Sequence, residues 1–333
     1  MNKRVTLKDI SEKTGFAKIT VSKALRDHKD ISEETRTFIQ KTASDMGYIK
    51  NASAYSLRSG RTNTIALIIA DLANPFFAII TKQVEKYAEK LGYVITVMNT
   101  DEDIKKEIAA INTAISMNVD GILLFSSQKS REPLEIIKNS EVPCVLMARE
   151  FENSPFPSVI FDDFNAGYIA TEHLIKAGFK NILMLSANDY NYSSIERYKG
   201  YVAAHKDYKI KINEKLHIYI GSLSGKCNEV FENISADSFD AVLAYNDILA
   251  LEVIQTLKDK DVFVPKDVAV VGFDDIGAVT PYLFPLTTVT MPTDLLAKLS
   301  VNKLYEIITE KNDEKTTEKL AVKLNIREST KNK

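Results

Sequence analysis

The sequence is poor in features that would indicate a secreted, membrane-bound or disulfide-bonded protein. Its 333 residues include two cysteines, Cys144 and Cys227, without metal-ligand spacing, so we expect reduced thiols and a cytoplasmic location. The longest apolar runs, "TIALIIA" and "DGILLF", are far too short to cross a bilayer, so we expect no membrane contact. The N-terminal segment lacks the apolar core of a secretory signal.

Motifs of the common nucleotide-binding and enzyme classes are also missing. The chain contains no G-x-G-x-x-G, no G-x-x-x-x-G-K-[ST] and no G-x-S-x-G. Its four histidines are scattered without the spacing of a metal site. We therefore expect no cofactor, no metal ion and no enzymatic activity.

Charge is divided unevenly along the chain. Residues 1–61 carry a net charge of +6, whereas the rest of the chain carries −8, which gives −2 overall. A small basic head on an acidic body indicates that the head contacts a polyanion.

The first fifty residues have the pattern of three short helices. The first covers about 7–14 behind the N-cap Thr6, the second about 18–25, and the third about 33–46 behind the N-cap Ser32. Two helices joined by a tight glycine-containing turn, followed by a third, are typical of a helix-turn-helix domain.

The second helix has an apolar face for the core and an outward face that suits a DNA groove. Lysine can donate to guanine acceptors, isoleucine can touch a thymine methyl, and hydroxyl groups suit phosphates. The residues of this head that we expect at the DNA are Thr6, Lys18, Ile19, Thr20, Ser22, Lys23, Ser32 and Thr35. On the pattern alone, a plain three-helix bundle with a solvated basic face is the alternative.

The stretch "VTLKDISEKTGFAKITVSKALRD" resembles the DNA-binding head of the lac repressor (LacI/GalR) family, and "ISEETRTFIQKTASDMGYIKNASAYSLRSGRT" continues the match. The resemblance implies that the second helix enters the major groove. Two positions depart from the family pattern. Ala17 stands where Ser or Thr often caps the recognition helix, and Lys50 stands where Pro is usual.

Residues 51–61 have the pattern of a helix too short to be stable alone, capped by Asn51. The resemblance implies a hinge helix in the minor groove, with Ala54 as a contact and Leu57 as a wedge between base pairs. Apolar wedges of this kind kink the duplex. A solvated linker with an incidental leucine is the alternative.

From residue 62 onward, apolar strand-like runs alternate with helical patterns. Runs such as "NILMLS" and "DVAVVGF" are almost continuously apolar, as in parallel strands buried on both faces. We predict an α/β core of doubly wound parallel sheets, in which ligands bind beyond the carboxyl ends of the strands.

Aromatic and polar side chains follow several of these predicted strands. Aromatic rings stack on a sugar ring, and Asp, Asn and Arg bind hydroxyls or an anion, so the set suits a sugar-like ligand. The strand-end residues that we expect to bind it are Asn74, Phe76, Phe77, Ser193, Arg197, Asn246 and Asp274. A capping or surface role suits any one of them as well, and Asp247 is expected to be an N-cap.

The body also resembles the effector-binding core of the lac repressor family, which is similar to periplasmic sugar-binding proteins. The motifs "NPFF", "RYKG", "AYNDILALEVI", "VPKDVAVVGFDD" and "PLTTV" occur in the family's order. The resemblance places at effector-contacting positions Arg197, Asn246 and Asp274 and, less closely, Phe77 and Ser193. Where many members have an Asp, this chain has Ala148 followed by Arg149, and we hypothesise that Arg149 favours an anionic group.

The expected architecture is a small all-α head plus a periplasmic-binding-protein-like core of two subdomains around an effector cleft. The predicted boundaries are 1–50 for the helix-turn-helix domain, 51–61 for the hinge, 62–333 for the core, about 62–160 with 291–322 for one subdomain, and about 161–290 with 323–333 for the other.

The sequence therefore predicts a transcriptional regulator, most simply a repressor, that binds a palindromic operator as a homodimer and responds to a carbohydrate effector. A dimer is expected because no leucine-heptad tail for a tetramer is present. Two alternatives are a transport-type sugar-binding protein and an enzyme on a doubly wound fold. A third is a catabolite-control regulator, in which a phosphocarrier protein docks near Lys303.

Overall fold

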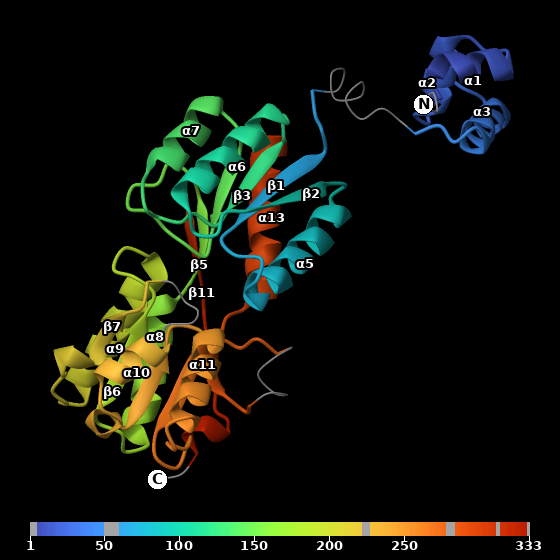
Figure 1. The fold of residues 1–333 in the computed structure, drawn as a ribbon. Coiled ribbons are helices and arrows are strands. Elements are labelled where there is room, and N and C mark those ends of the chain that lie inside the picture. The colour runs from blue at the N-terminus through green and yellow to red at the C-terminus, as the bar shows by residue number, and fades with distance from the viewer. Residues whose placement is uncertain (1–4, 50–59, 222–226, 278–283, 311–313, 332–333) are drawn as a thin grey trace. The chain divides into compact units, whose positions relative to one another are not determined.

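The computed structural model describes residues 5–49, 60–221, 227–277, 284–310 and 314–331 (Figure 1). The chain forms two compact units, Met1–Thr62 and Asn63–Lys333. The predicted hinge contacts Asn51, Ala54 and Leu57 lie outside the described residues.

The first unit is a three-helix domain of α1 (Leu7–Thr14), α2 (Lys18–Ala24) and α3 (Glu33–Asp45). Thr6 begins α1 with a capping box, in which its backbone N–H donates to Asp9 Oδ2 at 2.7 Å. The helix ends at Gly15, whose φ of 75° is the left-handed conformation that glycine adopts most easily. Buried apolar residues from all three helices form the core of this unit: Ile10, Val21, Ala24, Leu25, Ile39 and Ala43.

The second unit contains two sheets, and the first, sheet A, is parallel throughout. Its strand order is β11-β5-β4-β3-β1-β2. The strands are β1 (Thr64–Ile69), β2 (Val94–Asn99), β3 (Gly121–Leu124), β4 (Cys144–Met147), β5 (Ser158–Phe161) and β11 (Thr317–Leu320). Its helices are α5 (Pro75–Lys90), α6 (Ile104–Ser116), α7 (Glu132–Ser140) and α13 (Thr293–Glu310). In Figure 1, α13 lies beside α5, far from it in sequence.

Sheet B has the strand order β12-β10-β9-β8-β6-β7. Its strands are β6 (Ile182–Ser186), β7 (His217–Tyr219), β8 (Ala241–Ala244), β9 (Ala269–Asp274), β10 (Thr287–Thr290) and β12 (Lys323–Asn325). The helices are α8 (Asp163–Lys176), α9 (Tyr192–Asp207), α10 (Cys227–Asn233) and α11 (Asp247–Lys258). Short 3-10 turns lie at Glu214–Leu216, Ala236–Ser238 and Glu328–Thr330.

The chain passes between the two sheets after β5, after β10 and after β11. The predicted α/β class with two doubly wound sheets is confirmed, with two corrections. First, β12 pairs antiparallel to β10, so sheet B is not wholly parallel. Second, Ser193 and Arg197, expected only as residues beyond the end of a strand, lie in helix α9.

Helices α8 and α9 pack unusually closely. A Cβ added at Gly167 would lie 2.1 Å from the carbonyl oxygen of Arg197, and one added at Gly200 would lie 2.1 Å from that of Phe164. The two glycines therefore let the backbones touch, and this contact places Arg197 of α9 against the first turn of α8.

Within the described part of the chain, no helix is long and apolar enough to span a membrane. The same residues contain no cluster of His, Cys, Asp and Glu that could hold a metal ion. Both cysteines are free and buried.

Candidate functional site

Helix α2 presents the outward face that the sequence predicts. Val21 and Ala24 are buried, whereas Lys18 is exposed and the side chain of Ile19 is 72% exposed. With this exposure, the Ile19 side chain is accessible to a binding partner. As the sequence suggests, Ala17 provides no side-chain cap for this helix.

Other predicted DNA contacts already have partners inside the head. The Thr6 hydroxyl donates to Asp9 at 2.7 Å, and the Ser32 hydroxyl donates to Thr35 Oγ1 at 2.9 Å. The Lys23 ammonium lies 3.1 Å from Asp30. The remaining two predicted contacts, Thr20 and Ser22, are half-buried on α2, where Ser22 Oγ accepts from Arg26. Lys18 and Ile19 are therefore the side chains of the predicted set that are most accessible to a partner.

In the second unit, Arg197 stands at the centre of a buried polar cluster at the carboxyl edge of sheet B. Its Nε donates to Asp163 at 2.7 Å and its Nη1 donates to the carbonyl oxygen of Tyr245 at 2.6 Å. The guanidinium also lies between two rings, 4.3 Å from the centroid of Phe273 and 5.0 Å from that of Tyr245. Ser193, one turn earlier on α9, donates to the other oxygen of Asp163 at 3.0 Å.

The charges of this cluster nearly cancel. Burial raises the pKa of the Asp163 carboxyl and the guanidinium of Arg197 opposes this rise, while the pKa of Arg197 stays raised so that its charge is kept. Asp274, the last residue of β9, is also buried. Its backbone is in the left-handed region, with φ 105°. Burial raises the pKa of Asp274 well above its usual value, and the guanidinium of Arg197 opposes this rise.

The N-cap of α11 is Asn246 and not, as expected, Asp247. Asn246 is the N-cap of α11, with its side-chain oxygen accepting from Leu249 N at 2.8 Å. Asp247 is fully buried and accepts from Ile276 N at 2.9 Å and from the Thr288 hydroxyl. Asp247 therefore holds the segment after β9, which begins with Asp275.

On the side of sheet A, Arg149 is buried and already paired. Its Nη1 donates to Glu102 Oε2 at 3.0 Å, its Nη2 donates to Glu102 Oε1, and its Nη1 also donates to the carbonyl oxygen of Ser126. Burial disfavours the charge, but Glu102 outweighs burial and raises the pKa of Arg149. A bidentate pair leaves little uncompensated charge, so the hypothesis that Arg149 attracts an anion loses its physical basis.

The remaining predicted residues serve the fold at the N-terminus of α5. Asn74 caps this helix by accepting from Phe76 N at 3.0 Å. Phe76 and Phe77 are buried in the core and make edge-to-face contacts with Phe161 and Phe125. Both rings therefore contribute to the packing around the N-terminus of α5.

Sequence reasoning missed three members of the Arg197 cluster: Asp163, Tyr245 and Phe273. Asp163 comes two residues after β5 in "FDDF", and Tyr245 follows β8 directly, so the strand-end rule applied to both. Phe273 lies inside β9 and gave no such signal.

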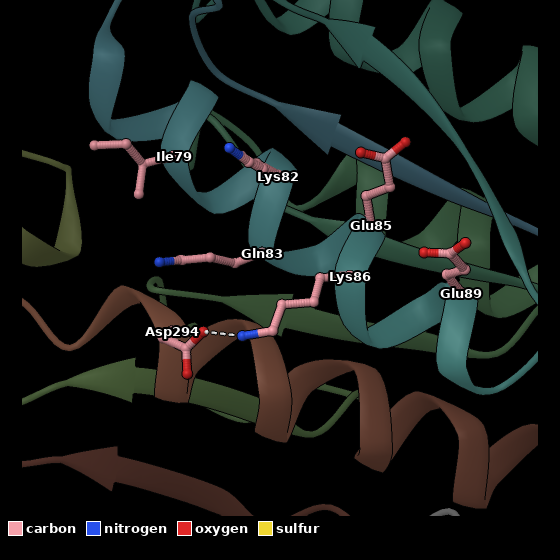
Figure 2. A pocket seen from close by; sticks show the side chains of 7 residues that line it. All are labelled: Ile79, Lys82, Gln83, Glu85, Lys86, Glu89 and Asp294. Atoms are coloured by element: carbon pink, nitrogen blue, oxygen red, sulfur yellow. Dashed lines mark hydrogen bonds and ion pairs between the residues drawn. The ribbon is translucent and has the colours of Figure 1, made fainter. Parts of the chain in front are cut away.

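A groove lies between α5 and α13, beside sheet A (Figure 2). This groove of about 510 Å³ is lined by Ile79, Lys82, Gln83, Glu85, Lys86, Glu89 and Asp294. Long charged side chains dominate it, and Lys86 reaches Asp294 at 3.4 Å. Further along α13, the half-buried Lys303 donates to Thr316 at 2.7 Å, which gives Lys303 a role inside the fold.

Comparison with known proteins agrees with this geometry. Residues 6–51 match the family described as bacterial regulatory proteins of the lacI family. Residues 62–328 match the family of periplasmic binding proteins and the sugar-binding domain of the LacI family. The transcriptional regulator RegA of Clostridium saccharobutylicum is 30% identical over 98% of this chain and 99% of its own.

Two solved structures extend the comparison. The complex of the regulator CelR with cellobiose shares 25% identity and a TM-score of 0.72 over 98% of this chain and 100% of that one. The lac repressor dimer bound to operator and the anti-inducer ONPF shares the fold, with 22% identity and a TM-score of 0.85 over 98% and 99%. The chain therefore belongs to the LacI family of DNA-binding transcriptional regulators, with a sugar-binding-type core and no enzymatic role.

Proposed function

We propose that this regulator is a repressor that binds a palindromic operator as a homodimer through the exposed face of α2, around Lys18 and Ile19. The observation that carries the DNA contact is the solvent-exposed Ile19 beside an exposed lysine, on a helix whose opposite face is fully buried. A two-fold arrangement of heads matches a two-fold arrangement of half-sites.

Selection from a random duplex library, followed by fluorescence anisotropy on the enriched sequence, tests this proposal. We expect a palindromic site, a stoichiometry of two chains per duplex, and an affinity that falls steeply with salt. Binding of one chain to a non-palindromic site would refute the dimeric arrangement. Absence of salt-dependent binding would refute the DNA contact itself.

The effector that fits the core is a neutral polyhydroxylated molecule of the carbohydrate class. The observation that supports this choice is the internal charge balance of the cluster, with Arg197 paired to Asp163 and Arg149 paired to Glu102. The Asp274 carboxyl, buried beside Arg197, can hydrogen-bond to sugar hydroxyls. A phosphorylated sugar would bring a further negative charge, whereas both buried arginines in the described part of the core are already paired with carboxylates, so its phosphate would lose hydration without compensation.

Calorimetry on a panel of pentoses and hexoses, each tested with its phosphate ester, separates these two ligand classes. We expect the free sugar to bind and its phosphate to bind at least tenfold more weakly. Asp274→Ala is expected to abolish most of the sugar affinity, whereas Asp259→Ala, at the exposed C-terminal end of α11, serves as the control. A phosphate ester that binds more tightly than its free sugar would overturn the assignment.

A further inference from the structure

The backbone of Gln128 adopts a conformation that residues other than glycine rarely adopt. It lies in the loop after β3, and its φ of 61° falls in the left-handed region. Its backbone N–H donates to Ser126 Oγ at 3.2 Å. A non-glycine residue in this region costs free energy and persists where surrounding contacts fix it.

The side-chain amide of Gln128 bridges the two parts of the core. Its Nε2 donates to the carbonyl oxygen of Glu150 at 2.7 Å, in the loop between β4 and β5 of sheet A. Its Oε1 accepts from the backbone N–H of Tyr192 at 2.8 Å. Tyr192 is the first residue of α9, which belongs with sheet B.

This bridge acts on the helix that carries the Arg197 cluster. The first N–H groups of any helix lack partners within that helix. In α9, the Asn191 side chain accepts from Ser193 N at 2.9 Å, and Gln128 takes the neighbouring N–H of Tyr192. The N–H of Ser193 therefore has a neighbouring residue as its acceptor, whereas the N–H of Tyr192 has an acceptor that belongs with sheet A.

From these contacts we propose that Gln128 is a positioning residue for the effector site. It caps α9 from across the core, and so holds Ser193 and Arg197 in place only while the two subdomains are closed. The inference rests on the proposed function for the role of that site, but the bridge itself can be measured without any ligand.

Distances between the subdomains test the bridge in the full chain. Spin labels are attached at Met117→Cys, the C-cap of α6, and at Lys206→Cys on α9. Both positions are exposed, and they belong to the subdomains of sheet A and sheet B. The native Cys144 and Cys227 are buried. Gln128→Leu keeps the approximate size of the side chain and removes both hydrogen bonds of the side-chain amide. We expect its distance distribution to shift to longer values, with the ratio of closed to open molecules falling about two- to tenfold, as for one ordinary hydrogen bond.

Arg131→Met is the matched control. Arg131 also donates to backbone carbonyls of the loop after β4, those of Glu152 and Asn153, but it makes these bonds within one subdomain. This variant should leave the distance distribution as in the parent. Gln128→Glu keeps an acceptor for Tyr192 N and loses the donor to Glu150, so it should fall between the parent and Gln128→Leu.

A distance distribution for Gln128→Leu that matches the parent, in a variant that unfolds at the same urea concentration, would overturn the proposal. The second readout is the affinity for the neutral sugar that binds best in the panel above. We expect that affinity to fall two- to tenfold in Gln128→Leu and to stay constant in Arg131→Met. If no sugar binds, the proposed effector class fails, while the distances still decide whether Gln128 joins the subdomains.

Discussion

Gly200→Ala is the substitution that most directly tests how the fold builds the effector site. The added methyl carbon would lie 2.1 Å from the carbonyl oxygen of Phe164 and 2.6 Å from the backbone nitrogen of Tyr168. Real Cβ atoms essentially never approach below 3.0 Å. Helices α8 and α9 must therefore separate by about 0.9 Å, because the atoms in contact are backbone and cannot rotate away.

The cost of this separation can be compared with what alanine gains. Alanine in a helix is favoured over glycine by about 1 kcal/mol. Overpacking a core costs about 1–3 kcal/mol or more, and loss of one partner from a buried ion pair costs about 3–5 kcal/mol. Because the separation strains the 2.7 Å bond between Arg197 and Asp163, we expect a net loss of at least about 2 kcal/mol in the free energy of unfolding.

Urea unfolding followed by circular dichroism measures this loss, with Lys199→Ala as the control. Lys199 is the neighbouring residue on the exposed face of α9, and its surface pair with Glu196 contributes at most about 1 kcal/mol. A Gly200→Ala protein as stable as the Lys199→Ala protein would refute the argument that backbone contact between α8 and α9 sets the position of Arg197.

Three further outcomes follow from the contacts described. Burial raises the pKa of Asp247 to about 7 from 3.8, so the folded state keeps a proton that the unfolded state loses, and stability falls by about 3 kcal/mol between pH 4 and pH 7. The Asp247→Asn protein has no carboxyl to ionise at this position, so its stability should not fall in this way. Urea midpoints that drop equally between pH 4 and pH 7 in the parent and in Asp247→Asn would contradict the assignment. Lys18→Ala should change the preferred base at one half-site position, and an equal weakening on all sequences would make Lys18 a phosphate contact. Thr6→Ala removes the capping box, so hydrogen exchange across α1 should quicken about fivefold, in line with about 1 kcal/mol; unchanged exchange would show that packing alone holds this helix.

Much of the fold could be predicted because its signals are local. The Thr6 cap, Gly15 and the spacing of Val21 and Ala24 define the helices of the head, and continuous apolar runs define the central strands. The orientation of β12 could not be predicted, because a three-residue strand has the same pattern in a parallel or an antiparallel pair.

Helix α9 escaped prediction for a related reason. Its buried face consists largely of small and polar residues such as Ser193, Ser194 and Gly200, so it has little apolar periodicity. It packs through close backbone approach to α8, which depends on the partner helix and leaves no hydrophobic pattern in the sequence.

The candidate site was predicted only in part. The strand-end rule identified Arg197 and Asp274, because parallel strands bring their carboxyl ends to one edge. It could not assign partners, since Asp163 meets Arg197 across 34 positions of sequence. The sequence also pointed to Asp247 as the N-cap of α11, whereas the cap is Asn246, because backbone conformation decides the cap: Asn246 is extended, with φ −150° and ψ 175°, and Asp247 is already helical.

Control of DNA binding by a ligand requires that the ligand bind two states of the protein with different affinity. Helix α9 satisfies this requirement in a specific way. Its inner face supplies Arg197, its glycine contact with α8 fixes that side chain against Asp163, and its first N–H is held by Gln128 from the other sheet. A ligand that binds Arg197 and Asp274 is therefore held by a helix whose capping changes when the subdomains separate. The proposed role of Gln128 thereby couples affinity to closure through one hydrogen bond, without requiring contact between Gln128 and the ligand.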